Sequence, residues 1–196
     1  RDRTDDTLSQ QKLESYLWGC AEYLRNKIDA GDYKVYIFPM LFYKRVSDVF
    51  DEEYESLLQE TNDEKYAKNP INHRFTIPEG FHCSDLRKCT KDVGERIQKS
   101  MREIGKANPD TLYDIFGDAN WGYKERLSDE TLIDLIEHFS TEKLSLERVP
   151  NDQMGNGYEY LIKKFADDSG HTAAEFYTNR SLVSLMTELL LSLIHI

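Results

Sequence analysis

The stretch LESYLWGCAEYLRNKIDAG, residues 13–31, decides the fold class of this chain. Its apolar residues recur at three- and four-residue steps, the spacing of a helix with one buried face. The members of this stripe are Leu13, Leu17, Cys20, Ala21, Leu24 and Ile28. Thr7 followed by Gln10 offers a capping box, and Gly31 stands where a left-handed residue commonly ends a helix. The pattern predicts a helix over about residues 8–30.

A second helix is predicted from further apolar residues at helical spacing, which are Phe38, Leu41, Phe42, Val46, Val49, Phe50, Tyr54 and Leu57. Pro39 either lies in the first turn of this helix or kinks it, because proline lacks an amide hydrogen and crowds the preceding turn. The acidic residues Asp51, Glu52, Glu53 and Glu55 are interpreted as a solvated outer face.

The remaining chain is also predicted to be helical, apart from its connections. Residues 61–83 are expected to form a loop in which only RFTI could extend. Helices are then predicted from Ser84 to Asn108, with Cys89 on the buried stripe, from Ser128 through Phe139, and over residues 151–169 up to Gly170. Val149-Pro150 favours a domain junction near residue 150, and strand signals are almost absent. The predicted fold class is therefore mainly α.

Composition limits the possible functions. The 25 basic and 36 acidic residues give a net charge of −11, so we expect poor DNA binding unless a partner supplies positive surface. The longest apolar run, residues 35–43, is far shorter than the ~20 residues of a membrane span. The amino end has no signal-peptide pattern, which favours a cytoplasmic protein without a membrane segment.

The cysteines predict no disulfide and no metal site. Cys20, Cys83 and Cys89 are odd in number and follow no export signal, so they are expected to be reduced thiols. The cluster His73, His82, Cys83 and Cys89 matches no zinc-binding spacing, and no metal is predicted.

The common catalytic motifs do not occur in this sequence. Gly155-Asn156-Gly157 lacks the preceding strand of a dinucleotide site, which favours close helix packing as the role of these glycines. No catalytic residue is predicted on these grounds.

The segment GHTAAEFYTNRSLVSLM, residues 170–186, runs from a helix terminator through a polar loop into another apolar helical pattern. Backbone amides and a hydroxyl converge at such a place and can hold an anion. An ordinary cap, with Thr178 or Asn179 capping the helix above Phe176 and Tyr177, explains the same residues. The residues alone leave both interpretations open.

Three segments together resemble the modification subunit of type I restriction-modification systems, a DNA adenine methyltransferase. They are D-A-x-x-Y-K at residues 29–34, Y-E-Y-L-I at residues 158–162 and E-F-Y-T-x-R at residues 175–180. The likeness covers about residues 8–190. It implies an amino-terminal helical bundle at residues 1–150, followed at residues 151–196 by the first helices of a truncated α/β methyltransferase domain.

The resemblance also implies a cofactor site, S-adenosylmethionine, at the E-F-Y-T-x-R loop. The residues carried over by position are Glu175, Phe176, Tyr177, Thr178, Asn179 and Arg180. Thr178 and nearby amides would face the methionine carboxylate, and the aromatic rings would form the wall. Asn179 stands where the family usually has proline, which makes its own contact less certain than that of Thr178. The implied partners are the specificity and restriction subunits, with DNA bound through the assembled complex.

Two family features are missing from this stretch of chain: a glycine-rich cofactor strand and the N-P-P-[FY] tetrapeptide that holds the extruded adenine. The fragment alone is therefore predicted to be inactive. The tail LSLIHI, residues 191–196, departs from the family pattern, and an origin in cloning, a frameshift or a truncated gene stays open. The competing hypotheses are a helical protein-interaction module unrelated to methylation and a stand-alone DNA-binding protein, which the acidic composition disfavours.

Overall fold

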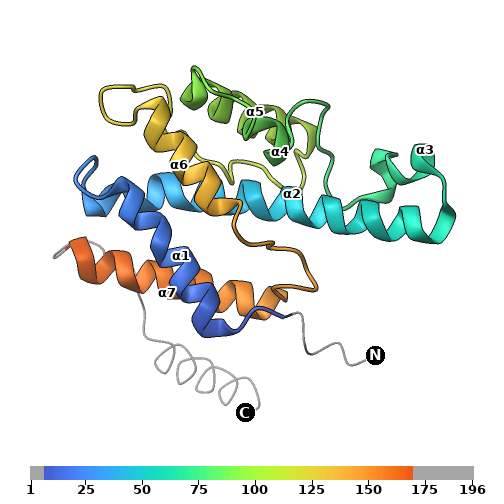
Figure 1. Ribbon diagram of the computed structural model, residues 1–196, viewed down its shortest axis with the longest axis horizontal. Coiled ribbons are helices and arrows are strands. Elements are labelled where there is room, and N and C mark those ends of the chain that lie inside the picture. Colours follow the sequence, from blue (N-terminus) through green and yellow to red (C-terminus); the bar gives the residue numbers. More distant parts are fainter. Residues whose placement is uncertain (1–6, 170–196) are drawn as a thin grey trace, which may run out of the picture.

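The computed structural model describes residues 7–169, and every regular element in that range is a helix (Figure 1). The predicted mainly α-helical fold is thereby confirmed. The elements are α1 (Gln10–Leu24), η1 (Ala30–Asp32), α2 (Tyr33–Thr61), α3 (Glu64–Ala67), η2 (Pro70–Asn72), α4 (Cys83–Leu86), α5 (Val93–Ala107), α6 (Asp129–Phe139) and α7 (Asn151–Ser169). The long helix α2 crosses the molecule, with α4, α5 and α6 above it and α1 and α7 below in Figure 1.

Helix α1 begins near its predicted start but ends earlier than predicted. The side chain of Ser9 accepts a hydrogen bond from the amide of Lys12 at 3.3 Å, so the cap predicted at Thr7 is wrong. The chain leaves the helix before Asn26, which takes a left-handed φ of 64°. Gly31 lies instead in η1. Asn can adopt this conformation because its short polar side chain tolerates it, so the terminating residue was misassigned.

Helix α2 is 29 residues long and begins at Tyr33, before the apolar set from which it was predicted. Pro39 lies inside the helix, beyond its first turn, and is buried. Without an amide hydrogen, Pro39 cannot donate to the carbonyl of Val35. Burial of Tyr36 and Ile37 before the proline, and of Met40 after it, offsets this lost bond.

The connection after α2 contains more structure than predicted. Residues 61–83 include the short helices α3 and η2 rather than a plain loop, and RFTI forms no strand. His82, not Ser84, caps α4 by accepting from the amide of Ser84 at 3.1 Å. The helix predicted from Ser84 to Asn108 is divided into α4 and α5, and Cys89 lies between them, partly exposed. Its predicted place on a buried helical stripe is therefore wrong.

The ends of α5 and α6 follow the sequence predictions more closely. Asn108 ends α5, where its side-chain amide donates to the carbonyl of Ile104 at 2.7 Å. Ser128 caps α6 by accepting from the amide of Thr131 at 3.3 Å, as predicted. The carboxylate of Asp129 accepts from the backbone amide of Val93 at 2.9 Å and thereby joins the start of α6 to the start of α5.

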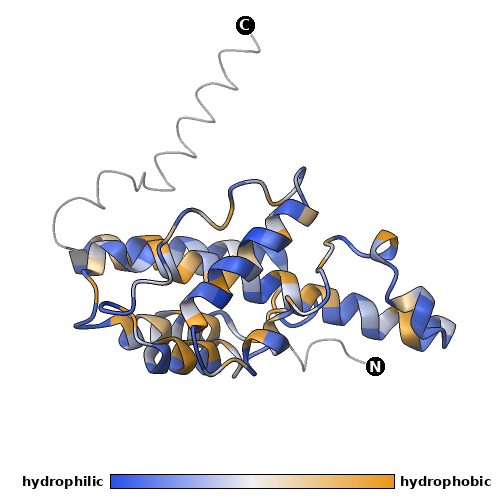
Figure 2. Ribbon diagram, turned by 90° about the horizontal axis from the view of Figure 1, so that it is seen from above, coloured by the Kyte–Doolittle hydropathy of each residue, from blue (hydrophilic) through white to orange (hydrophobic). Residues whose placement is uncertain are grey.

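The core lies along α2 and is shared by both groups of helices. The largest fully buried side chains include Trp121, Tyr43 and Phe139. Orange and blue residues alternate along each helix in Figure 2, as expected of helices with one buried face. Within residues 7–169, no helix combines the length and the apolar character that crossing a membrane requires.

Candidate cofactor site and the helix that leads to it

The predicted cofactor loop lies outside the described residues. This applies to Glu175, Phe176, Tyr177, Thr178, Asn179 and Arg180, and also to the predicted helix terminator Gly170. The structure does describe α7, the helix from which the chain continues toward that loop. The structure therefore bears on how α7 is packed, and the predicted cofactor residues stay a prediction.

The body of α7 is held by aromatic and aliphatic packing. Phe165 is buried, with its ring centroid 6.1 Å from that of Tyr33, 5.9 Å from that of Trp18 and 5.8 Å from that of Phe38. Two turns earlier, the ring of Tyr158 lies 4.4 Å from that of Phe38. These rings come from the three helices α1, α2 and α7. We call this packing around Phe165 the apolar seat of α7.

Gly157 permits the close approach of α7 to α1. A β-carbon at this position would lie 2.8 Å from Leu17 Cδ1 and 3.2 Å from Leu13 Cδ2, distances shorter than ordinary van der Waals contact. Gly155 faces open space instead. The predicted packing role is confirmed for Gly157, which lies within a helix and not in a dinucleotide-binding loop.

The first of the three segments that carry the family resemblance lies against α7, the helix that contains the second. Residues 29–34 form η1 and the start of α2, and η1 contacts α7, which contains residues 158–162. Tyr33 makes an edge-to-face contact with Phe165, one turn after the second segment on α7. Burial raises the pKa of Tyr33, and the charge of Asp168 raises it further. The tyrosine is therefore neutral and serves packing.

A hollow beside the last turn of α7 is lined by cationic residues that already have partners. Arg25 pairs with Glu22 at 2.9 Å, and Lys27 donates to the hydroxyl of Thr131 at 2.6 Å. Asp168 also lines the hollow. The hollow therefore combines charges of both signs with bound donors and does not form a ready site for a carboxylate.

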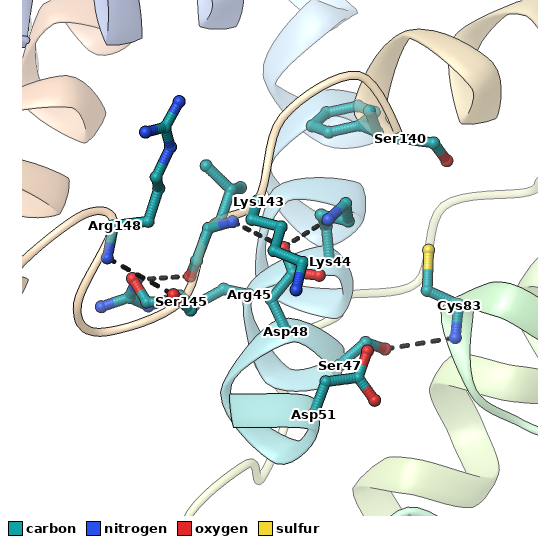
Figure 3. Close-up of polar contacts among 12 residues, drawn as sticks. Lys44, Arg45, Ser47, Asp48, Asp51, Cys83, Ser140, Lys143, Ser145 and Arg148 are labelled. Carbon is teal, nitrogen blue, oxygen red and sulfur yellow. Dashed lines mark hydrogen bonds and ion pairs between the residues drawn. The ribbon is translucent and has the colours of Figure 1, made fainter. Parts of the chain in front are cut away.

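The linker, residues 140–150 between α6 and α7, is bound by α2 (Figure 3). Arg45 Nη1 donates to the carbonyl oxygens of Leu144, of Ser145 at 2.7 Å and of Val149 at 2.8 Å. Its Nη2 donates to Asn151 Oδ1, on the first residue of α7, at 3.0 Å. Burial lowers the pKa of Arg45, while nearby carboxylates raise it, and the guanidinium stays charged.

Two carboxylates on α2 bind linker amides. Asp48 Oδ2 accepts from the amide of Leu144 at 2.6 Å and from Lys44 Nζ, and both charged side chains are buried. Glu52 accepts from the amides of Leu146 and Glu147, each at 2.8 Å. The interpretation of the acidic run as a solvated face is therefore wrong for Glu52, which binds backbone, whereas Glu55 is exposed as predicted.

The neighbouring face of α2 binds the segment that leads into α4. Ser47 Oγ accepts from the amide of Cys83 at 3.2 Å, and His82 Nε2 lies 3.1 Å from Asp51 Oδ1. Burial lowers the pKa of His82, but the hydrogen bond and charge of Asp51, with smaller contributions from the Ser47 carbonyl and Asp85, raise it above its ordinary value. Asp51 is thus a second member of the acidic run with a structural partner.

The histidines and cysteines that are close in sequence at residues 73–89 have partners other than a metal ion. His73 Nε2 lies 2.6 Å from the carbonyl oxygen of Ala67, and Cys89 Sγ donates to a backbone carbonyl. Burial raises the pKa of Cys83 to about 12, so its thiol keeps its proton. Over residues 7–169 no three His, Cys, Asp or Glu side chains are grouped as metal ligands would be.

Residues 13–139 match the family model described as the HsdM N-terminal domain, which covers more than half of the chain. The chain belongs to this family. Residues 149–193, which include α7 and the predicted cofactor loop, match the family model described as N-6 DNA Methylase. The family resemblance inferred from the three segments is thereby confirmed.

Individual relatives give a consistent result. The chain is 27% identical, over 91% of its length, to the type I restriction enzyme MjaIX methylase subunit of Methanocaldococcus jannaschii. It is 25% identical, over 93% of its length, to the MpnII methylase subunit of Mycoplasma pneumoniae. The chain spans only 35% and 40% of these two proteins.

A solved structure shares the fold. It is the type I restriction-modification system methyltransferase subunit from Streptococcus thermophilus, with a TM-score of 0.63 and 24% sequence identity. The match covers 92% of this chain and 44% of that one. At this identity the similarity establishes the arrangement of helices and nothing further.

Proposed function

We propose that this chain is the amino-terminal part of a type I modification subunit, whose full-length form transfers a methyl group from S-adenosylmethionine to adenine in DNA. The supporting observation is the order of two family matches along one chain, the HsdM N-terminal domain at residues 13–139 and N-6 DNA Methylase at residues 149–193. In this proposal residues 1–150 form the helical domain, and residues 151–196 begin the methyltransferase domain.

Within this proposal the cofactor residues are Glu175 through Arg180. S-adenosylmethionine supplies an electrophilic methyl group when bound, and its carboxylate needs hydrogen-bond donors. The hydroxyl of Thr178 and the adjoining amides would provide these donors, while Phe176 and Tyr177 would cover the ligand. The match of residues 149–193 to the N-6 DNA Methylase family model supports this assignment, because that range contains the loop.

The proposed substrate is an adenine turned out of the duplex, since its amino group cannot be reached within the base stack. The pocket for that base would lie in sequence beyond this chain, so the isolated chain should not turn over. A net charge of −11 makes tight DNA binding by this chain alone unfavourable. We therefore propose that the helical domain docks on a specificity subunit, within a cytoplasmic complex that also includes a restriction subunit.

The test uses the full-length subunit, purified with its specificity subunit. We expect methyl transfer to adenine in duplex DNA, and none by the 196-residue chain. Thr178→Ala should weaken S-adenosylmethionine binding about tenfold or more, corresponding to the loss of about 1.4 kcal/mol from a charge-assisted hydrogen bond. Thr172→Ala, a matched change outside the proposed contact set, should not.

The binding measurement should be calorimetric and made on the full-length subunit, because part of a cofactor pocket binds weakly. Absence of both cofactor binding and methyl transfer in the full-length wild type would refute the proposal in favour of a helical interaction module. Methyl transfer by the 196-residue chain alone would refute the assignment of the adenine pocket to later sequence.

A further inference from the structure

The linker between α6 and α7 is bound by α2 through hydrogen bonds to its backbone. Three α2 side chains, Arg45, Asp48 and Glu52, bind it, and we call them the linker latch. Arg45 satisfies three carbonyl groups, whereas Asp48 and Glu52 together satisfy three amides. Because amide donors and carbonyl acceptors of the linker are both bound, the latch fixes the path of the linker backbone.

The latch also reaches α7 directly. Arg45 donates to Asn151, the first residue of α7, and the amide of Met154 donates to the carbonyl of Pro150 at 2.9 Å. The linker side chains Leu144 and Val149 are fully buried, so the segment cannot shift without exposing apolar surface. The start of α7 is therefore tied to the middle of α2.

The other end of α7 is tied to the beginning of α2. Phe165 contacts Tyr33 and Phe38, while Arg45 contacts Asn151. Later residues of α7 thus pair with earlier residues of α2, and the two helices run in opposite directions. Two attachments along one rigid helix determine both the position and the direction of α7, which a single attachment would leave free to pivot.

We infer that the linker latch is a positioning device, which sets the direction of α7 and thereby of the chain that leads to the proposed cofactor loop of the methyltransferase domain. Arg45, Asp48 and Glu52 are then positioning residues for methyl transfer, an inference that rests on the proposed function. The apolar seat holds α7 against α1 and α2, and the latch fixes the orientation of α7. Small displacements of catalytic groups reduce turnover strongly, so loosening the latch should lower kcat.

The first experiment uses the 196-residue chain and does not depend on methylation. Hydrogen exchange is measured at the amides of Leu146 and Glu147 in Glu52→Ala, Glu52→Gln and Glu60→Ala. Glu52→Ala removes both acceptors, and we expect exchange about tenfold faster or more. Glu52→Gln keeps one acceptor and should be intermediate. Glu60→Ala, an exposed change on the same helix, should match wild type. Unchanged exchange in Glu52→Ala would overturn the latch.

The second experiment uses the full-length subunit in its complex, well below the unfolding midpoint of each variant. Glu52→Ala should lower kcat about tenfold while the dissociation constant for S-adenosylmethionine changes less than about twofold. Glu52→Gln should recover part of kcat, and Glu60→Ala should leave it unchanged. Faster exchange with unchanged kcat would refute the positioning role. A wild type that binds no S-adenosylmethionine and transfers no methyl group refutes the proposed function instead, and the exchange result then still describes the latch.

Discussion

Helix α7 is held by two regions that differ in chemistry, an apolar seat and a polar latch. The seat consists of rings and aliphatic side chains around Phe165 and Gly157, and it stabilises by burying surface without strong directional preference. The latch consists of Arg45, Asp48 and Glu52, whose hydrogen bonds require defined distances and angles. The seat thus attaches α7 to the bundle, whereas, in our proposal, the latch orients it.

The largest effect is expected in the latch, from Asp48→Ala. This change leaves the buried ammonium group of Lys44 without its counter-ion and the amide of Leu144 without its acceptor. We expect the free energy of unfolding to fall by about 3–5 kcal/mol, the usual cost of breaking a buried ion pair. Urea denaturation followed by circular dichroism measures it. A loss below about 1 kcal/mol would mean that Lys44 reaches solvent.

A loss of about 3 kcal/mol is expected in the seat, from Phe165→Ala. The change removes a buried ring that contacts three other aromatic rings. Phe165→Leu keeps most of the volume and should cost only about 1 kcal/mol. Urea denaturation of both variants tests this order. If the two substitutions cost the same, shape-specific packing would not explain the seat.

A smaller effect separates the two glycines of α7. Gly157→Ala places a methyl group against Leu17. Overpacking should cost about 1–3 kcal/mol and helix propensity should return about 1 kcal/mol, so we expect the free energy of unfolding to fall by up to about 2 kcal/mol. Gly155→Ala meets open space and should stabilise by about 0.5–1 kcal/mol. Thermal unfolding of both variants measures the difference. Equal shifts would contradict the close contact between α1 and α7.

The smallest effect is expected on the face of α2 next to the latch, where His82 meets Asp51. The pKa of His82 is raised in the folded protein, so the pair contributes stability fully below the unfolded pKa of about 6.5 and loses it as pH rises through the folded value. Asp51→Asn should therefore destabilise more at pH 5.5 than at pH 9 in urea titrations. A loss independent of pH would assign the effect to packing.

The sequence predicted the seat better than the latch for a physical reason. Burial of apolar residues on helices leaves a periodic pattern, and Leu13, Leu17 and Phe165 belong to such patterns. The sequence also predicted close packing at Gly157, because no strand precedes it and glycine lets helices approach closely. Glu52, in contrast, lies in a run of charged residues that has the composition of a solvated surface. Its partners are backbone amides almost a hundred positions away, and local sequence does not encode that separation.

Helix boundaries show the same limit. Ser128 and Asn108 were predicted correctly because each satisfies backbone groups of its own helix end. His82 was missed as the cap of α4, since histidine is not a common capping residue and its ring is oriented by Asp51 and the Ser47 carbonyl. The predicted cofactor residues Glu175 through Arg180 lie outside the described part of the chain and stay a prediction.

The helical class, the buried stripe of α1 and the family were readable from the sequence, because periodic burial and short local motifs are properties of neighbouring residues. Two features required the folded structure. One is which charged side chains of α2 hydrogen-bond to the linker backbone, and the other is the antiparallel course of α7 along α2. Those features depend on segments distant in sequence meeting at hydrogen-bond distance, and the pairing exists only once the core has brought them together.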